Sequence, residues 1–481
     1  MKFAIYITCL ILSYITRGVK TRIDTKQIIV LLSFDGFRHD FIERENLKNF
    51  KEIARSGVRA KSLQTTFVTK TFPNHFTMVT GLYEESHGIV GNYMYDPVYK
   101  EHFDPIQSSD DPKWWNATTP IWISNEIQFL KDSKRTRKSA TILWPGSETS
   151  YDGHWPYYTR KKYESNMTAK NRFDRILSLL TEPNPVNFIA CYFDEPDKTS
   201  HLYGPDHKNT SRVLNELDDT IGHFVDRLKN IDLYDKINIM LVSDHGMASV
   251  PSKNIIKLSN IIHPNEYDLV SYGTFLLIRP KKGMTKKIYK KLKNITHIKT
   301  YYRQDIPKQW HYKNNRRVTK IFAIADEGYY VTPGQANDYP YPRGDHGYDN
   351  MLMSMHGIFI AHGPAFKKKH EIDIVYNIDI YSLMCHILDI TPHPNNGTFE
   401  RVQDIVAEKT IFKVLMKSPA LAITLLSVCG IFVLVVILGC TISCYRNLVK
   451  SSKYSKLSSN DEPLARWHED DEVTEFDLRE R

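Results

Sequence analysis

The sequence contains few cysteines, and this scarcity argues against a fold stabilised by many disulfides. Only six cysteines occur in 481 residues. Four of them lie in apolar stretches near the two ends of the chain, which leaves Cys191 and Cys385 in the long segment between. Each of these two stands in an apolar run, and this setting favours two buried free thiols over one bridge. The chain must therefore depend on a hydrophobic core, and it contains no cysteine-rich accessory module.

The sequence also lacks a dominant charge. Its 64 basic residues are scattered among 55 acidic ones, and the net charge is +9. This excess is modest for the length and gives no signature of nucleic-acid binding, so we expect no nucleic-acid partner. The 41% hydrophobic content is sufficient for one large core.

Long apolar runs are scarce as well, and the two that occur lie near the ends of the chain. Residues 1–18 carry a lysine and then a short apolar run, as is typical of a secretory signal peptide. Residues 420–445 contain no charged residue and are long enough to cross a bilayer. Basic residues follow this run, which predicts that residues 446–481 form a cytoplasmic tail. We expect a single-pass type I protein of the plasma membrane, with residues 24–410 as one extracellular domain.

Glycosylation sequons support this orientation, because all five precede the long apolar run. Their asparagines are Asn116, Asn166, Asn209, Asn294 and Asn396. We expect N-glycans at these positions.

Three apolar runs are each followed at once by an aspartate. They are residues 27–34 before Asp35, residues 186–193 before Asp194, and residues 237–243 before Asp244. Such continuous apolar runs are typical of strands buried on both faces of a parallel sheet. Helical patterns at residues 47–56, 173–180 and 211–228 alternate with them. This alternation predicts an α/β fold, a doubly wound and mostly parallel sheet with helices on both faces, whose strand ends gather the acids.

The segment TKTFPNH, residues 69–75, has the pattern of a helix start. Thr71 stands just before the expected helix, and Pro73 lies in the first turn, where its missing N–H costs nothing. The free N–H groups of a helix start attract anions. A hydroxyl at this point can attack phosphorus if a bound cation helps to remove its proton. By itself, the same pattern also fits a simple threonine cap.

Aspartates and histidines suited to metal binding surround this segment in the sequence. Asp197 and His201 are four residues apart, so one helical turn would place them on the same face. We predict one ligand set of Asp35, Thr71, Asp244 and His245, and another of Asp197, His201 and His346. Carboxylate and imidazole are ligands that Zn²⁺ accepts in catalytic sites. Two ions about 4 Å apart can bind the entering and leaving oxygens of a displacement at phosphorus.

The order of these motifs resembles that of a known family. The motifs are SFDGF, TKTFPNH, GLYEESHGIVGN, DEPDxxxH, SDHGM, DHGYDN and MHGIFIAHGPAF. They are similar to those of the ectonucleotide pyrophosphatase/phosphodiesterase family of the alkaline phosphatase superfamily, over most of residues 28–396. The short form, with a catalytic domain and a membrane anchor, resembles members four and five.

This resemblance implies roles for particular residues. Thr71 would be the nucleophile and form a covalent nucleotidyl intermediate, beside two zinc ions held by the two predicted sets. Asn92 would donate to the phosphoryl oxygen. Phe72 would pack on the nucleobase, with Tyr157 or Tyr158 on the opposite side.

The expected function is hydrolysis of phosphodiester or pyrophosphate bonds in small nucleotides such as NAD, ATP, ADP and dinucleoside polyphosphates, with release of nucleoside 5'-monophosphate. A choline-phospholipid phosphodiesterase is an alternative within the family. A phosphomonoesterase is an alternative on the same fold, whereas a sulfatase would need a C-x-P-x-R motif that the sequence lacks.

A catalytically silent adhesion or receptor ectodomain is an alternative outside enzymology, because residues 343–345 spell RGD. The basic segment 281–294 fits either a contact with an anionic surface or, more simply, a solvated helix face.

Overall fold

The computed structural model describes residues 27–130, 137–159, 167–334, 341–407 and 419–457. One compact unit ends at Ala407, and a second contains helix α13 (Pro419–Leu457). Within the described residues, α13 is the one helix that is long and apolar enough to cross a membrane, at Gly430–Val449. This span overlaps the expected segment 420–445. The predicted signal peptide, Asn166 and the end of the predicted tail lie outside the described residues.

An eight-stranded sheet with the order β18-β2-β17-β8-β1-β7-β5-β6 forms the centre of the first unit. Its strands are β1 (Ile29–Phe34), β2 (Val58–Gln64), β5 (Ser139–Ile142), β6 (Tyr158–Thr159), β7 (Phe188–Phe193), β8 (Asn238–Val242), β17 (Gly357–His362) and β18 (His370–Tyr376). Only β17 runs antiparallel to its two neighbours in this sheet. The expected mostly parallel α/β sheet is therefore confirmed.

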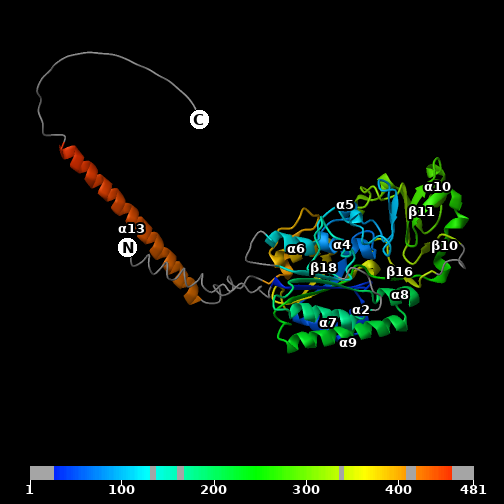
Figure 1. Ribbon diagram of the computed structural model, residues 1–481, viewed down its shortest axis with the longest axis horizontal. Coiled ribbons are helices and arrows are strands. Elements are labelled where there is room, and N and C mark those ends of the chain that lie inside the picture. Colours follow the sequence, from blue (N-terminus) through cyan, green and yellow to red (C-terminus); the bar gives the residue numbers. More distant parts are fainter. Residues whose placement is uncertain (1–26, 131–136, 160–166, 335–340, 408–418, 458–481) are drawn as a thin grey trace, which may run out of the picture. The chain divides into compact units, whose positions relative to one another are not determined.

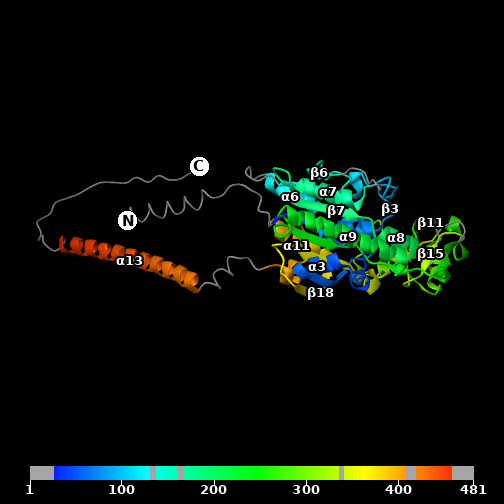
Figure 2. The same ribbon diagram turned by 90° about the horizontal axis from the view of Figure 1, so that it is seen from below.

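Helices cover both faces of this sheet (Figure 1). One face carries α4 (Thr71–Thr80), α6 (Ile121–Leu130) and α11 (Ile380–Leu388), and the other carries α3 (Lys48–Ser56), α7 (Ala169–Leu180) and α9 (Lys208–Asn230). Figure 2 shows α7, α9 and α3 side by side on this second face. Strand β1 contributes Ile29 and Leu31 to the core on the first face, and Val30 and Leu32 to the core on the second. Burial on both sides explains why its sequence is continuously apolar.

The helices begin where capping side chains allow them to begin. The pattern predicted a helix from residue 173, but α7 begins at Ala169 because the Thr168 hydroxyl accepts a hydrogen bond from the Asn171 N–H. In the same way, His207 caps α9, which begins at Lys208 rather than at residue 211. The apolar periodicity thus predicted the turns that face the core, and the capping side chains place the helix starts several residues earlier.

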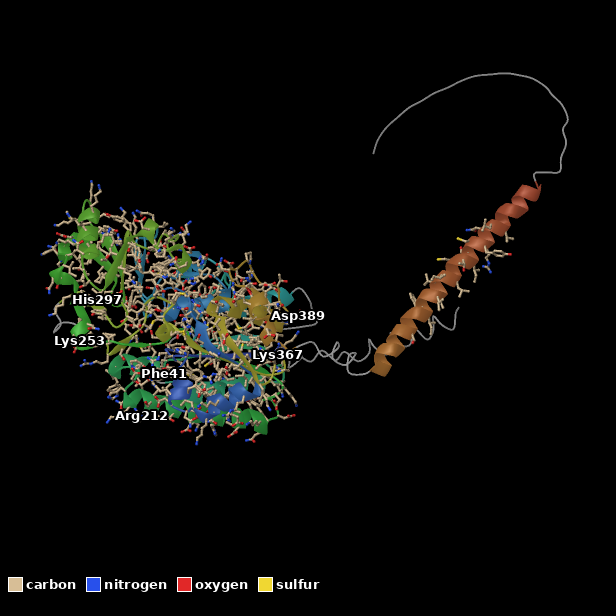
Figure 3. All side chains as sticks on the ribbon, turned by 180° about the vertical axis from the view of Figure 1, so that it is seen from behind. Phe41, Arg212, Lys253, His297, Lys367 and Asp389 are labelled. Carbon is tan, nitrogen blue, oxygen red and sulfur yellow. The ribbon has the colours of Figure 1, made fainter. Side chains whose placement is uncertain are left out.

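A second, antiparallel sheet was not expected from the sequence. Its order is β11-β12-β14-β13, and the strands are β11 (Tyr267–Ser271), β12 (Phe275–Pro280), β13 (Ile298–Tyr302) and β14 (Ile321–Ala325). Helix α10 (Thr285–Lys293) packs on it through Ile288 and Leu292, so the basic segment is an amphipathic helix with a solvated face. In Figure 3, His297 and Lys253 mark this end of the unit, and Asp389 lies at the opposite end.

The remaining helices and strands with four or more residues, or with a partner strand, are short. They are α2 (Phe41–Arg44), α5 (Glu84–His87), α8 (Asp197–Tyr203), β3 (Met94–Asp96), β4 (Glu101–Phe103), β9 (Ala248–Ser249), β10 (Ile255–Lys257), β15 (Tyr330–Thr332) and β16 (Gly344–Asp345).

The cysteines and sequons agree in part with the expectations. Cys191 and Cys385 are both buried and free, as expected. Asn116, Asn294 and Asn396 are exposed, and Asn209 is half-buried. Glycosylation at these positions remains a prediction.

A buried ion pair fastens the connection between β13 and β14 to the rest of the unit. Arg317 donates to the Asp96 carboxylate at 2.8 Å and to the carbonyl of Gly88 at 2.7 Å. Arg316 donates to the same carboxylate. Burial opposes the charge, but these hydrogen bonds lower the pKa of Asp96 to about 2. The ionised carboxylate therefore holds this connection in place.

Replacing Asp96 should destabilise the fold. Asp96→Ala leaves the Arg317 guanidinium buried without its carboxylate, and we expect the free energy of unfolding at pH 7 to fall by about 3–5 kcal/mol in denaturant titrations. The folded pKa of Asp96 is depressed, so its contribution is present above the unfolded pKa near 4. The difference between the two proteins should therefore shrink as the pH falls from about 4 toward 2.

The matched control is Asp373→Ala. Asp373 pairs with Lys61 on the surface, where both side chains are exposed, and exposed pairs contribute little. Equal effects of the two substitutions would contradict the structural role assigned to Asp96.

Candidate active site

The carboxyl edge of the central sheet gathers the predicted ligand residues. Asp35 follows β1, and Asp244 and His245 follow β8 shortly beyond Val242. Strands β7 and β8 pair with β1 in parallel, with Phe34 opposite Phe193 and Ser33 opposite Val242, so the three strands end side by side. Asp194 follows β7 at the same edge, as predicted, but it pairs with Arg172 of α7 and belongs to neither predicted ligand set.

Six side chains form two close groups at this edge. One group is Asp35, Asp244 and His245, and the other is Asp197, His201 and His346. Within each group, the possible ligand atoms lie within 4.8 Å of one another. Asp197 and His201 belong to one turn of α8, as their spacing predicted. The structure thus brings these residues together in the two expected sets.

Backbone carbonyls fix the tautomer of each histidine in the site. The Nδ1 atoms of His201, His245 and His346 lie 2.7, 2.9 and 2.7 Å from the carbonyl oxygens of Gly344, Gly246 and Thr69, respectively. We assign the proton to Nδ1 in each case, because a carbonyl can only accept. The Nε2 atom of each ring then faces the site, where it offers a lone pair whenever the ring is neutral.

These lone pairs face carboxylate oxygens rather than donors. His245 Nε2 lies 3.2 Å from Asp35 Oδ1 and 3.0 Å from Asp244 Oδ2. His201 Nε2 lies 3.3 Å from Asp197 Oδ1. None of these three buried oxygens has a hydrogen-bond partner among the described residues. Two hydrogen-bond acceptors that face each other in a buried site are unfavourable unless a cation lies between them. These carboxylate oxygens and imidazole nitrogens are therefore suited to bind divalent metal ions.

The electrostatics of the cluster agree with this interpretation. Burial, and then the nearby charges of Asp244 and Asp197, raise the pKa of Asp35 well above its ordinary value. Burial, and then His245 and Lys70, lower the pKa of His346 well below its ordinary value, which keeps that ring neutral. Burial disfavours charge on His245 too, but Asp244 raises its pKa. The buried carboxylates therefore favour the binding of positive charge in the site.

Thr71 lies beside the first group. It is the first residue of α4, with Lys70 as the cap, so the expectation that Thr71 precedes the helix is wrong by one residue. Pro73 lies in the first turn, as expected. The Thr71 hydroxyl is almost fully buried, 3.4 Å from His245 Nε2. A helix N-terminus and a hydroxyl therefore meet at the metal-binding groups.

Asn92 and Phe72 lie next to this hydroxyl. The Phe72 N–H donates to Asn92 Oδ1 at 3.0 Å, so the amide nitrogen of Asn92 is the end that can donate to a ligand. The Phe72 ring is partly exposed and rests against Phe103 and Trp115, at centroid distances of 5.8 and 6.1 Å. This position suits a ring that stacks on a ligand.

Tyr157 and Tyr158 are not brought to the site, which corrects the expectation from the sequence. The Tyr157 hydroxyl donates to Glu182. Its ring lies against Lys138, the residue just before β5. Tyr158 begins β6, opposite Ala140. Because β5 and β6 are parallel, these tyrosines lie toward the amino ends of the strands, whereas the site lies at the carboxyl ends. The sequence between Gly153 and Tyr158 contains several aromatic residues, and no pattern in it distinguishes a stacking ring from a structural one.

Sequence reasoning missed three residues that support the site. The Tyr192 hydroxyl donates to Asp35 Oδ2 at 2.5 Å. His75 donates to the Thr71 carbonyl and accepts from Ser33, both at 2.8 Å. Lys70 donates to Asp345 at 2.9 Å. Tyr192 was concealed in an apolar strand pattern, and His75 is part of the TKTFPNH segment itself.

The remaining motifs have structural roles. Asp345 is only 4% exposed and pairs with Lys70, so the RGD tripeptide does not present a free aspartate. His356 contacts Ser62, and His362 contacts Ser56 and stacks on Tyr234. Neither histidine belongs to the two metal-binding groups.

The central sheet and the site at its carboxyl edge define an α/β protein with the alkaline phosphatase-like fold, as expected. Residues 29–349 match the model of the family described as type I phosphodiesterase / nucleotide pyrophosphatase. The chain therefore belongs to the ectonucleotide pyrophosphatase/phosphodiesterase family of metal-dependent hydrolases.

Individual relatives agree with this assignment. The chain is 39% identical to the bis(5'-adenosyl)-triphosphatase enpp4 of Xenopus laevis, over 91% of this chain and 93% of the relative. It is 35% identical to human family member 5, over 79% and 78%. A solved structure of murine family member 5, an inactive threonine-to-alanine variant in complex with AMP, matches with a TM-score of 0.75 and 35% identity over 79% of this chain and 99% of that chain. The resemblance to members four and five is confirmed.

The hydrogen bond from Tyr192 should strengthen metal binding. Tyr192→Phe removes the donor to Asp35, and loss of such a supporting bond typically weakens metal affinity about 10- to 100-fold. We expect the variant to lose its metal, and its activity, at a correspondingly lower chelator concentration. Tyr158→Phe is the matched control and should behave like the unmodified protein. If Tyr192→Phe resisted the chelator equally well, the hydrogen bond would have no part in holding the metal.

Proposed function

We propose that the protein is a two-zinc nucleotide pyrophosphatase/phosphodiesterase in which Thr71 is the nucleophile. The observation that carries the proposal is the position of the Thr71 hydroxyl, which lies at a helix N-terminus and 3.4 Å from a histidine whose lone pair faces two buried carboxylates. Zinc at the two groups would supply positive charge that lowers the pKa of a bound hydroxyl and stabilises charge on phosphate oxygens. Aspartate and histidine ligands are compatible with zinc.

The residues of the chain suit a two-step displacement. The Thr71 oxygen gives its proton to solvent and bonds to the α-phosphorus of the nucleotide, while the bond from phosphorus to the leaving oxygen breaks and its electron pair stays on that oxygen. Water then hydrolyses the threonyl ester and releases the nucleoside 5'-monophosphate. The Asn92 amide nitrogen and the Thr71 N–H at the start of α4 would donate to the phosphoryl oxygens, where negative charge develops.

The proposed substrates are nucleotides such as NAD, ATP, ADP and dinucleoside polyphosphates. Phe72 supports this choice, because its ring is partly exposed beside Asn92 and anchored by two further aromatic rings. The relatives also support it: one bears the name bis(5'-adenosyl)-triphosphatase, and a solved structure contains AMP.

Replacing the nucleophile should abolish turnover. Thr71→Ala should lower kcat for p-nitrophenyl thymidine monophosphate by about 10³-fold or more, because removal of a nucleophile leaves only binding and electrostatic contributions. Thr71→Ser keeps a hydroxyl and should retain measurable activity. Retention of full activity by Thr71→Ala would contradict the assignment of Thr71.

The same assay tests the identity of the metal. Activity removed by a chelator should return with Zn²⁺ and should not return with Mg²⁺, which binds oxygen ligands in preference to imidazole. Recovery with Mg²⁺ alone would contradict the zinc assignment.

We further propose a single-pass type I topology in the plasma membrane, with the catalytic domain outside and N-glycans on it. Helix α13 supports the anchor by its length and composition. The exposure of Asn116, Asn294 and Asn396 supports glycan attachment.

Surface labelling of intact cells tests this topology. A reagent that cannot cross membranes should label the catalytic domain, and a glycosidase should lower its apparent mass. The combined variant Asn116→Gln, Asn294→Gln and Asn396→Gln should show a smaller mass shift. A domain that is labelled only after the cells are permeabilised would contradict an extracellular position.

A further inference from the structure

The loop between β11 and β12 lies directly against a metal-binding histidine. Thr274 of this loop donates from its hydroxyl to the carbonyl of His346 at 2.7 Å. A Cβ atom on Gly347 would come within 2.3 Å of the same hydroxyl, so the two segments are in tight contact. Tyr272 stands two residues before Thr274 and is 44% exposed. The second sheet therefore carries an exposed tyrosine two residues away from this contact with His346.

Tyr330 belongs to the same corner. Gly273 exchanges backbone hydrogen bonds with Val331 at 3.1 and 2.9 Å, which fixes the loop beside β15. A Cβ atom on Gly273 would lie 3.1 Å from the Tyr330 ring and 3.5 Å from Asp345 Oδ2. The Tyr330 ring is therefore close to the carboxylate that pairs with Lys70 and immediately precedes His346.

A third tyrosine, Tyr93, stands on a neighbouring segment. Tyr93 follows Asn92 and is 50% exposed. Its segment packs against the start of β12, because a Cβ atom on Gly91 would lie 3.6 Å from the Phe275 ring. Arg279 of β12 also lies over the ring of Tyr95. Tyr330, Tyr272 and Tyr93 thus form a row on three adjoining segments, with Asp345 beside one end and Asn92 beside the other.

The direction of the displacement assigns a role to this row. In an in-line reaction, the leaving group departs on the side of phosphorus opposite the Thr71 oxygen. Thr71 adjoins the group that contains His245, so the leaving group departs toward the group that contains His346. Tyr330 and the Tyr272 loop adjoin Asp345 and His346 on that side, whereas Phe72 packs with Phe103 and Trp115.

We propose that Tyr272, supported by Tyr330, binds the second aromatic base of a dinucleoside polyphosphate, at the far end of the leaving group. This inference rests on the proposed function. A leaving group that ends in phosphate needs only cations, whereas a leaving nucleoside diphosphate carries an aromatic base. An exposed phenol ring provides a stacking surface for such a base without requiring a particular sequence of hydrogen bonds. The protein therefore distinguishes dinucleotides from substrates that end at the cleaved bond.

A comparison of two substrates tests this specificity residue. Diadenosine triphosphate carries a second base, and p-nitrophenyl thymidine monophosphate ends just beyond the reacting phosphate. In the full-length enzyme, Tyr272→Ala should lower kcat/KM for the dinucleotide about tenfold more than for the p-nitrophenyl ester, because one base stack is typically lost. The change should fall mainly on KM.

Two further variants separate stacking from other effects. Tyr272→Phe keeps the ring and should retain the dinucleotide preference of the unmodified enzyme. Tyr376→Ala removes a tyrosine that is 37% exposed on β18 and should leave the ratio of the two kcat/KM values unchanged. Thermal unfolding of each variant shows whether a loss of activity comes from a loss of folded protein.

The outcomes distinguish the inference from the proposed function. Equal losses on both substrates in folded Tyr272→Ala, or a Tyr272→Phe variant as impaired as Tyr272→Ala, would overturn the stacking role. So would an unmodified enzyme that cleaves the p-nitrophenyl ester and leaves diadenosine triphosphate intact. An unmodified enzyme that cleaves neither substrate would instead overturn the proposed function itself.

Discussion

The site depends on an arrangement of buried lone pairs that face one another. Backbone carbonyls hold the Nδ1 protons of three histidines, so in each neutral ring the Nε2 atom that faces the site is an acceptor. The carboxylate oxygens opposite them are acceptors as well. In a metal-free protein this arrangement is unfavourable, and the fold must hold it in place against mutual repulsion. Bound cations would remove this repulsion, because each cation attracts the same oxygen and nitrogen atoms.

The central sheet is suited to hold such an arrangement. Strands β1, β7 and β8 are adjacent and parallel, and both faces are buried, so their carboxyl ends stay aligned. His75 then ties helix α4 to this edge, because its ring contacts the Thr71 carbonyl on one side and the hydroxyl of Ser33 on the other. Ser33 lies two residues before Asp35. Thr71 and the first carboxylate are thus positioned by one short chain of contacts.

Sequence patterns predicted the parts of this structure that depend on local chemistry. Continuous apolar runs located β1, β7 and β8, and the spacing of Asp197 and His201 located their shared face on α8. Sequence patterns failed where tertiary contacts decide the surroundings of a side chain. Asp194 follows its strand like Asp35, yet Arg172 draws it away. Tyr192 resembles a core residue, yet its hydroxyl binds Asp35. In the second sheet, β12 and β13 pair with β14 across long connections, and such pairing leaves no local signal in the sequence.

The two sheets contribute different residues to the region of the site. The central sheet supplies every residue of the two metal-binding groups except His346, either at its strand ends or on the adjoining helix α8. The second sheet supplies Tyr272 at a loop, where a change of side chain alters the surface and not the core. The two meet at the hydrogen bond from Thr274 to the His346 carbonyl. Because this bond holds the backbone rather than the imidazole ring, residues beside Thr274 can change which leaving group is recognised while the tautomer of His346, fixed separately by the Thr69 carbonyl, stays the same.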